Sequence, residues 1–135
     1  MGEEITVEMT APVKALLEAV ENKISCKIYH AEALKGASAP FVFWLQVNED
    51  EDEDLAGLTG LRTDSYEFHC CARTLAELNA LSYAVRSALF SVHGTVKNGY
   101  VYERITVRMT SPVLHEKEVG LYRKVYLATI HYQEE

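Results

Sequence analysis

Three groups of residues in this chain could do chemistry: five histidines, three cysteines and a run of acids. The histidines are His30, His69, His93, His115 and His131, and the cysteines are Cys26, Cys70 and Cys71. No two histidines have the H-x-x-x-H or H-E-x-x-H spacing that brings both to one zinc ion. An odd number of cysteines with one adjacent pair fits neither a disulfide framework nor a C-x-x-C site. We therefore expect no metal site and reduced thiols.

His69 and Cys71 lie two residues apart, so on a strand they share one face, which we expect to be exposed. They could hold a metal only with ligands from elsewhere in the chain, and a solvated face is the simpler interpretation. A small hydrolase or redox protein that uses Cys70, Cys71 and His69 is a competing hypothesis. The chain contains no G-x-S-x-G, Walker or G-x-G-x-x-G motif. We therefore expect no enzymatic activity and no cofactor.

Six consecutive acids form the third group: Glu49, Asp50, Glu51, Asp52, Glu53 and Asp54. They lack the D-x-D-x-D-G spacing that wraps a calcium ion, so we expect only weak attraction of counterions. A run of like charges repels itself, which predicts a solvated, mobile loop over residues 48–61. The whole chain has a formal net charge of -7, which argues against nucleic-acid binding through neutralised phosphates.

The stretch 66–89 organises the predicted fold. Its first part places Tyr66, Phe68, Cys70 and Ala72 on one side, and Glu67, His69, Cys71 and Arg73 on the other. This period of two predicts a strand with one buried face, so that Cys70 points inward and Cys71 outward. Thr74 and Glu77 then form a capping box, in which each side chain bonds the backbone amide of the other residue. The amphipathic helix that follows must fold back onto the buried face of the strand, because almost no loop separates them.

The remaining elements complete an α+β domain. We predict a helix over 10–23 and strands over 26–30, 41–47, 100–109 and 121–131, with a hairpin turn at Asn98-Gly99. In the strand over 41–47 we place Phe41, Phe43 and Leu45 in the core. The predicted architecture has two layers: a largely antiparallel sheet of about four main strands, with two amphipathic helices on one face. Residues 10–135 form this single domain, and residues 1–9 precede it as an extra strand or a flexible arm.

Aromatic and arginine side chains gather on the sheet face that we expect to point away from the helices. They are Trp44, Tyr100, Tyr102, Arg104, Arg108 and Tyr126. Protein interfaces are enriched in Tyr, Trp and Arg, so this face predicts contact with another subunit or a partner. The alternatives are a solvated face with cross-strand aromatic pairs, and the wall of a ligand pocket.

Two distant segments are nearly the same. Residues 5–13 and 105–113 agree at seven of nine positions. Two copies so far apart are no repeat array, which needs many copies at a short period. If residues 5–9 form a strand, that strand could pair with a neighbouring subunit.

The order of the predicted elements resembles a known family. A helix over 13–24 and the strand over 26–30 precede Pro40-Phe-Val-Phe-Trp44, Tyr66-Glu-Phe-His-Cys-Cys-Ala-Arg73, a helix ending in Ala84-Val-Arg-Ser-Ala-Leu89, and two closing strands. Over residues 13–132 this pattern is similar to the small tail-completion or tail-terminator proteins of long-tailed bacteriophages and prophages. The resemblance rests on element order and apolar pattern, and it includes no catalytic motif.

The resemblance implies a structural virion protein that forms a ring, commonly a hexamer, at the head-proximal end of the tail tube. Such a ring ends tube assembly and joins the tail to the head-closure or connector protein, without a reaction or a cofactor. It can be monomeric in isolation and assemble only on its tube. Its lumen passes DNA, and the acids of 49–54 are expected at the lumen or the ring end, where like charge keeps the duplex from adhering.

Two other functional classes fit the same residues. One is another head–tail connector or neck protein, which differs from a tail terminator only in its neighbours. The other is a host-encoded α+β module that binds a ligand or a protein. No apolar run approaches the length that spans a membrane. The expected location is the virion tail, after synthesis in the bacterial cytoplasm.

Overall fold

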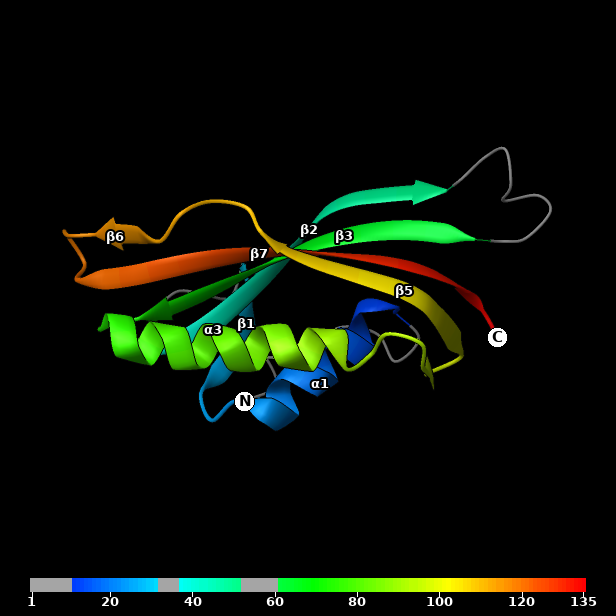
Figure 1. Ribbon diagram of the computed structural model, residues 1–135, viewed down its shortest axis with the longest axis horizontal. Coiled ribbons are helices and arrows are strands. Elements are labelled where there is room, and N and C mark those ends of the chain that lie inside the picture. The colour runs from blue at the N-terminus through cyan, green and yellow to red at the C-terminus, as the bar shows by residue number, and fades with distance from the viewer. Residues whose placement is uncertain (1–10, 32–36, 52–60) are drawn as a thin grey trace.

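The computed structural model describes residues 11–31, 37–51 and 61–135, and only the backbone of 48–51 (Figure 1). The elements are α1 (Val13–Lys23), β1 (Lys27–His30), β2 (Phe41–Glu51), β3 (Arg62–Ala72), α3 (Leu75–Phe90), β4 (Val96–Lys97), β5 (Tyr100–Met109), β6 (Leu114–Glu116) and β7 (Leu121–Glu134). The predicted start of the first helix at Thr10 lies outside the described residues, as do residues 1–9. Its predicted end at Lys23 is confirmed.

All seven described strands belong to one mixed sheet, in the order β1-β2-β3-β7-β5-β4, with β6 paired to the start of β7. Strand β1 runs parallel to β2, and the other pairs are antiparallel. The sheet curls around α1 and α3, which lie together on its concave side (Figure 1). The α+β class is therefore confirmed, whereas the prediction of two layers with about four main strands is wrong, because seven described strands form one curled sheet. The short strands β4 and β6 have two and three residues, too few to show an alternating pattern.

The predicted unit of strand and helix is present. Tyr66, Phe68, Cys70 and Ala72 of β3 all point into the main core. The amide of Glu77 donates to Thr74 Oγ1 over 3.1 Å, as the capping box predicts. The return bond differs from the prediction, because Glu77 Oε1 accepts from the amide of Arg73 over 3.2 Å and not from that of Thr74. Either bond satisfies an amide at the start of the helix, so the cap is retained.

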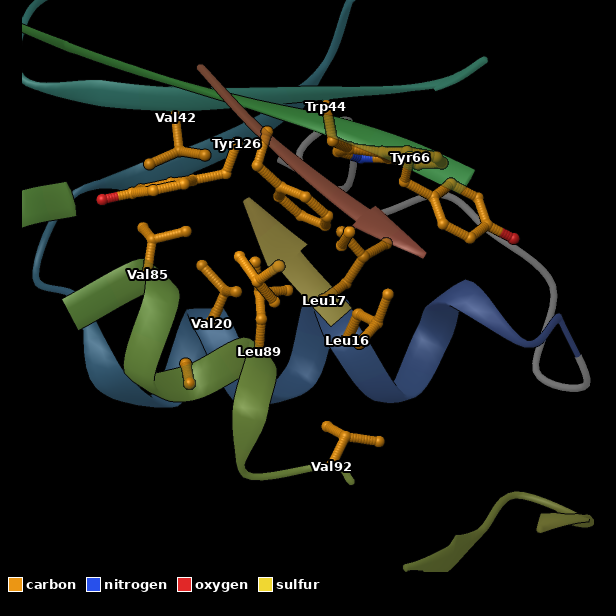
Figure 2. Close-up of a cluster of buried hydrophobic side chains, with 14 of the residues drawn as sticks. Leu16, Leu17, Val20, Val42, Trp44, Tyr66, Val85, Leu89, Val92 and Tyr126 are labelled. Carbon is orange, nitrogen blue, oxygen red and sulfur yellow. The ribbon is translucent and has the colours of Figure 1, made fainter. Parts of the chain in front are cut away.

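The main core lies between the helices and the concave side of the sheet (Figure 2). Helix α1 contributes Leu16, Leu17 and Val20, all fully buried. Helix α3 contributes Val85 and Leu89 from the side that faces the sheet. Each such side chain contributes about 1.5–3 kcal/mol relative to leaving it exposed, which makes this layer the main source of stability.

Strand β2 has the opposite orientation from the one predicted. Val42 and Trp44 are in the main core (Figure 2), whereas Phe41 and Phe43 form a second cluster with Cys71 on the outer face of the sheet. Both faces of β2 are apolar, so alternation alone could not decide which one meets the helices. The outer face near Cys71 is therefore buried, although the sequence predicted it to be exposed.

Strand β2 also extends four residues beyond the predicted end at Val47. The backbone of Glu49, Asp50 and Glu51 pairs with β3, so the loop predicted over 48–61 begins later than expected. The ladder between β2 and β3 shifts register around Val47, as in a β-bulge. Asp52, Glu53 and Asp54 lie outside the described residues.

A second bulge changes the orientation of β5. The pairing with β7 shifts register between Tyr102 and Arg104, which leaves Glu103 as an extra residue. An extra residue reverses the alternation of side chains, so Tyr102 joins Ile105 and Val107 in the core. The prediction that Tyr102 and Arg104 share a face is therefore wrong. The hairpin turn before β5 is confirmed, with φ of 54° at Asn98 and 87° at Gly99, the positive values of a type I′ turn.

The cap of α3 generates the first prediction. Thr74→Ala should lower the free energy of unfolding by about 1 kcal/mol, because the amide of Glu77 loses its acceptor. Urea denaturation followed by circular dichroism measures this change. Thr110→Ala makes the same substitution at an exposed position and should change stability by less than about 0.5 kcal/mol. Equal losses in the two variants would contradict the role of the cap.

Candidate interaction surfaces

The aromatic and arginine side chains of the predicted interface do not lie together on one exposed surface. Trp44, Tyr102 and Tyr126 are buried in the main core, so their predicted outward orientation is wrong. Tyr100 is half-buried at the edge of that core, with its ring 5.4 Å from the ring of Tyr132. Arg104 and Arg108 are the two members of the predicted set that are exposed.

Buried tyrosines surround an acid at one end of the core. Asp64 is 3% exposed, and its Oδ2 accepts hydrogen bonds from Tyr66 over 3.1 Å and from Tyr132 over 2.9 Å. Burial, assisted by Asp64, raises the pKa of both phenols well above the ordinary value. The two hydroxyls therefore stay protonated and donate to the carboxylate, which is a structural arrangement that holds β3 and β7 together.

His69 lies on the outer face of β3, opposite Phe43 of β2. Its Nε2 donates to Glu67 Oε1 over 2.9 Å, and its ring stacks on Phe43 with centroids 4.2 Å apart. Burial lowers the pKa of His69, the hydrogen bond to Glu67 opposes that shift, and the charge of Arg123 reinforces it. The other ring nitrogen, Nδ1, is buried and has no hydrogen-bond partner among the described residues.

The cysteines are not activated as nucleophiles. Burial raises the pKa of Cys71 to about 12 and also raises those of Cys70 and Cys26. A reactive thiol needs a lowered pKa, because the thiolate is the nucleophile and the metal ligand. The described part of the chain contains no group of three or more His, Cys, Asp or Glu that could hold a metal ion. No described helix is long and apolar enough to cross a membrane.

Open hollows lie on the surface, and one of about 530 Å³ is lined by residues 115–119 of the β6–β7 hairpin. Another of about 310 Å³ lies between the end of α1 and α3, and Cys26 is part of its wall. A third of about 390 Å³ lies beside the turn between β6 and β7, where Arg73, Val119 and Leu121 line it. None of the predicted aromatic residues lines any of these hollows.

The side of α3 that faces away from the core is unusually apolar. Its eight exposed positions are Leu75, Ala76, Glu77, Asn79, Ala80, Tyr83, Arg86 and Phe90. Leu75 is 49% exposed, Tyr83 73% and Phe90 38%, and only two of the eight residues are charged. The Arg86 guanidinium lies 5.1 Å from the centre of the Phe90 ring, a cation–π contact. We call Leu75, Asn79, Tyr83, Arg86 and Phe90 the α3 outer stripe.

The composition of the α3 outer stripe is that of a protein interface, where aromatic residues and Arg are enriched and other charges are depleted. The sequence contained a signal for it, because 75, 83 and 90 are spaced by close to two helical turns. The helix was assigned a single apolar face, and this second one was missed.

A second group of exposed apolar side chains lies on the segment that leads into the β6–β7 hairpin and on its turn. Its members are Met109, Val113, Leu114 and Val119, which we call the 109–119 patch. They do not share one face of the sheet, because Met109 pairs with Tyr126 of the main core, whereas Leu114 pairs with Arg123 beside Cys71 of the outer cluster. Among the described residues nine large hydrophobic side chains are exposed, and four belong to this patch and three to the α3 outer stripe. The hairpin forms one end of the molecule (Figure 1). The α3 outer stripe follows one side of a helix, and a continuous exposed apolar group marks an interaction site more strongly than scattered side chains do.

Comparison with known proteins does not assign a family. No model of a known protein family matches the chain, and no curated protein matches it. The evidence for the α3 outer stripe and the 109–119 patch therefore comes only from the geometry and composition of this chain.

The lowered pKa of His69 predicts a loss of stability in acid. In the unfolded chain the pKa is about 6.5, so below that pH the unfolded state binds a proton before the folded state does. The free energy of unfolding should fall between about pH 7.5 and 5.5, and His69→Gln should flatten the fall. Urea denaturation over this range measures it. His131, whose pKa is lowered by burial and by Arg104, should leave a residual slope of the same sign.

His115→Gln is the matched control, because it removes a histidine from the exposed hairpin, where the ring stacks on Tyr122. This variant should keep the wild-type slope. An unchanged slope in His69→Gln would contradict the assignment to His69.

The raised pKa values of the thiols predict slow alkylation. With iodoacetamide near neutral pH, folded Cys70 and Cys71 should react at least about tenfold more slowly than in urea. Half-buried Cys26 should react first. Mass spectrometry of peptides gives the three rates. Fast modification of Cys71 in the folded protein would revive the hydrolase or redox hypothesis.

Proposed function

We propose that the chain is a structural virion protein that forms a ring at the head-proximal end of a phage tail tube. In this proposal the ring ends tube assembly and joins the tail to the connector. Support comes from the resemblance over residues 13–132 and from the α+β fold with its long strands β2, β3, β5 and β7. The proposed location is the virion, and the proposed partners are the tail tube protein and the head-closure protein.

The observation that carries the proposal is the presence of exposed apolar side chains at two separate places on one small domain, along α3 and around the β6–β7 hairpin. A closed ring uses heterologous contacts, in which one patch meets a different patch on the next copy. The α3 outer stripe and the 109–119 patch lie on different elements and differ in shape, one helical and one a hairpin with the segment leading into it. A domain with this pair of surfaces can both give and receive a contact, as every ring subunit must.

The acidic run gives weaker support to a ring whose lumen passes DNA. Glu49, Asp50 and Glu51 belong to the last part of β2, which is paired with β3 and therefore held in the sheet. In the proposed ring these acids face the lumen or the ring end, where like charge keeps DNA from adhering. The formal net charge of -7 acts in the same direction.

A neck protein of another kind would use the same surfaces with different neighbours. Electron microscopy of the purified chain mixed with tubes of the tail tube protein encoded nearest to it separates the two. A tail terminator adds a ring to one end of each tube and stops its growth. A chain that leaves tube ends bare but binds the head connector would be a different neck protein.

Tyr83→Ser should reduce ring formation on tube ends by about tenfold, because it removes the most exposed aromatic side chain of the stripe. Its stability should change by less than about 0.5 kcal/mol, since the side chain is 73% exposed. Counting capped tube ends in micrographs gives the first quantity, and urea denaturation gives the second.

Val47→Ser is the control, because Val47 is an exposed hydrophobic residue of β2 outside both surfaces, at 45% exposure. This variant should cap tubes as the wild type does. Normal capping by Tyr83→Ser would remove the stripe from the proposal, and bare tube ends with wild-type protein would overturn the proposed function.

A further inference from the structure

We propose that the free edge of β5, the side of residues 105–109 that faces away from β7, takes residues 5–9 of a neighbouring copy as an added strand. The added strand is antiparallel to β5, with Val7 opposite Val107. This inference rests on the proposed ring, in which copies lie side by side. In β-strand addition, main-chain hydrogen bonds provide affinity and alternate side chains provide specificity. The segment and the edge are different parts of the chain, so the contact is heterologous and can repeat around an axis.

The chain itself covers only the first part of the β5 edge. The amide of Gly94 donates to the carbonyl of Tyr102 over 2.8 Å, and the amide of Tyr102 donates to the carbonyl of Thr95 over 2.8 Å. One further group is satisfied by a side chain, because the amide of Ile105 donates to His93 Nδ1 over 3.1 Å. Strand β4 pairs with β5 only before these residues.

Beyond Ile105 the edge is open. Its amide points away from β7, and backbone groups point to the same side at every second residue of a strand. Those of Val107 and Met109 therefore also point away from β7, and no described strand pairs with them there. The amide of Thr110, by contrast, donates to the carbonyl of Val125 on β7. Such a row of unpaired groups is a template for another strand.

Residues 5–9 have the pattern of a strand that fits this edge. They agree with residues 105–109 at four of five positions, Ile5-Thr-Val-Glu-Met9 against Ile105-Thr-Val-Arg-Met109. Val107 is buried on the concave side of the sheet, and Met109, on the same side, is 50% exposed. Directly opposite residues share a face, so the proposed register brings Ile5 against Met109.

The one position that differs between the two segments carries opposite charges. Glu8 corresponds to Arg108. In the proposed register Glu8 lies opposite Thr106, diagonally between Arg104 and Arg108. Both arginines are exposed, and neither forms an ion pair among the described residues. Diagonal neighbours on paired strands lie about 7–8 Å apart, within reach of long side chains, so both guanidinium groups can approach Glu8.

The other open edge of the sheet fits this segment less well. Strand β1 pairs with β2 only as far as Trp44, so the rest of β2 is unpaired on that side among the described strands. This part of β2 ends in Glu49, Asp50 and Glu51, whose charges would repel Glu8. Charge therefore favours β5.

A neighbouring copy is better placed to supply the strand than the chain itself. Ala11 packs against the main core on the concave side of the sheet. The proposed register places Met9 at the sheet edge, so within one copy Thr10 alone would have to pass residues 91–95, which connect α3 to β4 at that edge. Extended, residues 5–10 span up to about 20 Å, which is enough to leave their own subunit.

Cross-linking tests which copy supplies the strand. Glu8 and Thr106 would form a pair without backbone hydrogen bonds between them, with Cα atoms about 4.5 Å apart, a distance that a disulfide spans. Two preparations both carry Cys26→Ser, which leaves only the buried Cys70 and Cys71. One adds Glu8→Cys and the other Thr106→Cys. Mixed on tube ends under mild oxidation, they should form a disulfide between copies, which peptide mass spectrometry identifies.

Val47→Cys in place of Thr106→Cys is the control, because Val47 is exposed on β2, near the other edge of the sheet. It should give at least about tenfold less of the link. A single dilute chain with both Glu8→Cys and Thr106→Cys should stay unlinked, and a disulfide within that chain would overturn the neighbour as the source. Rings without links would overturn the pairing and leave the ring intact. The absence of rings with wild-type protein would instead overturn the proposed function, and the pairing with it.

A pair of proline variants tests the backbone bonds. Val7→Pro should lower the number of capped tube ends about tenfold, because it removes the amide that donates to the carbonyl of Val107. Thr6→Pro makes the same change where the amide points away from β5, so this variant should cap tubes as the wild type does. Circular dichroism in urea verifies that both variants fold. Normal capping by Val7→Pro, or an equal loss in both variants, would overturn the proposed strand addition.

Discussion

The short joint between β3 and α3 is the constraint on which the rest of the structure depends. Only Arg73 and Thr74 separate the last residue of the strand from the first residue of the helix. The cap at Thr74 fixes where the helix starts, and the apolar side of the helix must then lie against the strand that precedes it. Helix α1 packs beside α3, and the sheet curls around both (Figure 1). The direction of the α3 outer stripe follows from the same joint, because the side opposite the core must face outward.

The curl of the sheet determines which residues remain available for contacts. Strands β2 and β5 each carry a register shift, and bulges increase local bending and twist. The shift in β5 moves Tyr102 into the core, where its hydroxyl donates to the carbonyl of Pro12 over 2.5 Å. Trp44, Tyr102 and Tyr126, which suggested an interface on the sheet, thereby fill its concave side. Most of the exposed large hydrophobic side chains among the described residues therefore lie on the helix and around the hairpin.

The sequence predicts the elements whose pattern is local and one-sided. Local residues alone predict the inward face of the strand over 66–73, the helix start at Thr74 and the turn at Asn98-Gly99. Strand β2 was misoriented because Val42 and Trp44 are as apolar as Phe41 and Phe43, so only the position of α1 and α3 decides the face. Tyr102 was misplaced because nothing local marks Glu103 as the extra residue. The α3 outer stripe is hard to predict for a different reason. In sequence, a helix with two apolar sides has the same pattern as a helix with one broad apolar side that faces the core.

Electrostatic repulsion between copies acts over longer distances than apolar contacts do. This difference affects the conditions under which the proposed ring would form. At physiological ionic strength a charge is screened beyond about 8 Å, so copies with a formal net charge of -7 repel mainly on close approach. Apolar contacts act only once the surfaces meet. In free solution, repulsion between like-charged copies would oppose closure of the proposed ring. A tube end that binds each copy separately raises the local concentration and offsets that repulsion, because the second contact becomes intramolecular. A subunit that is monomeric alone and assembles on its tube is the behaviour that this balance favours.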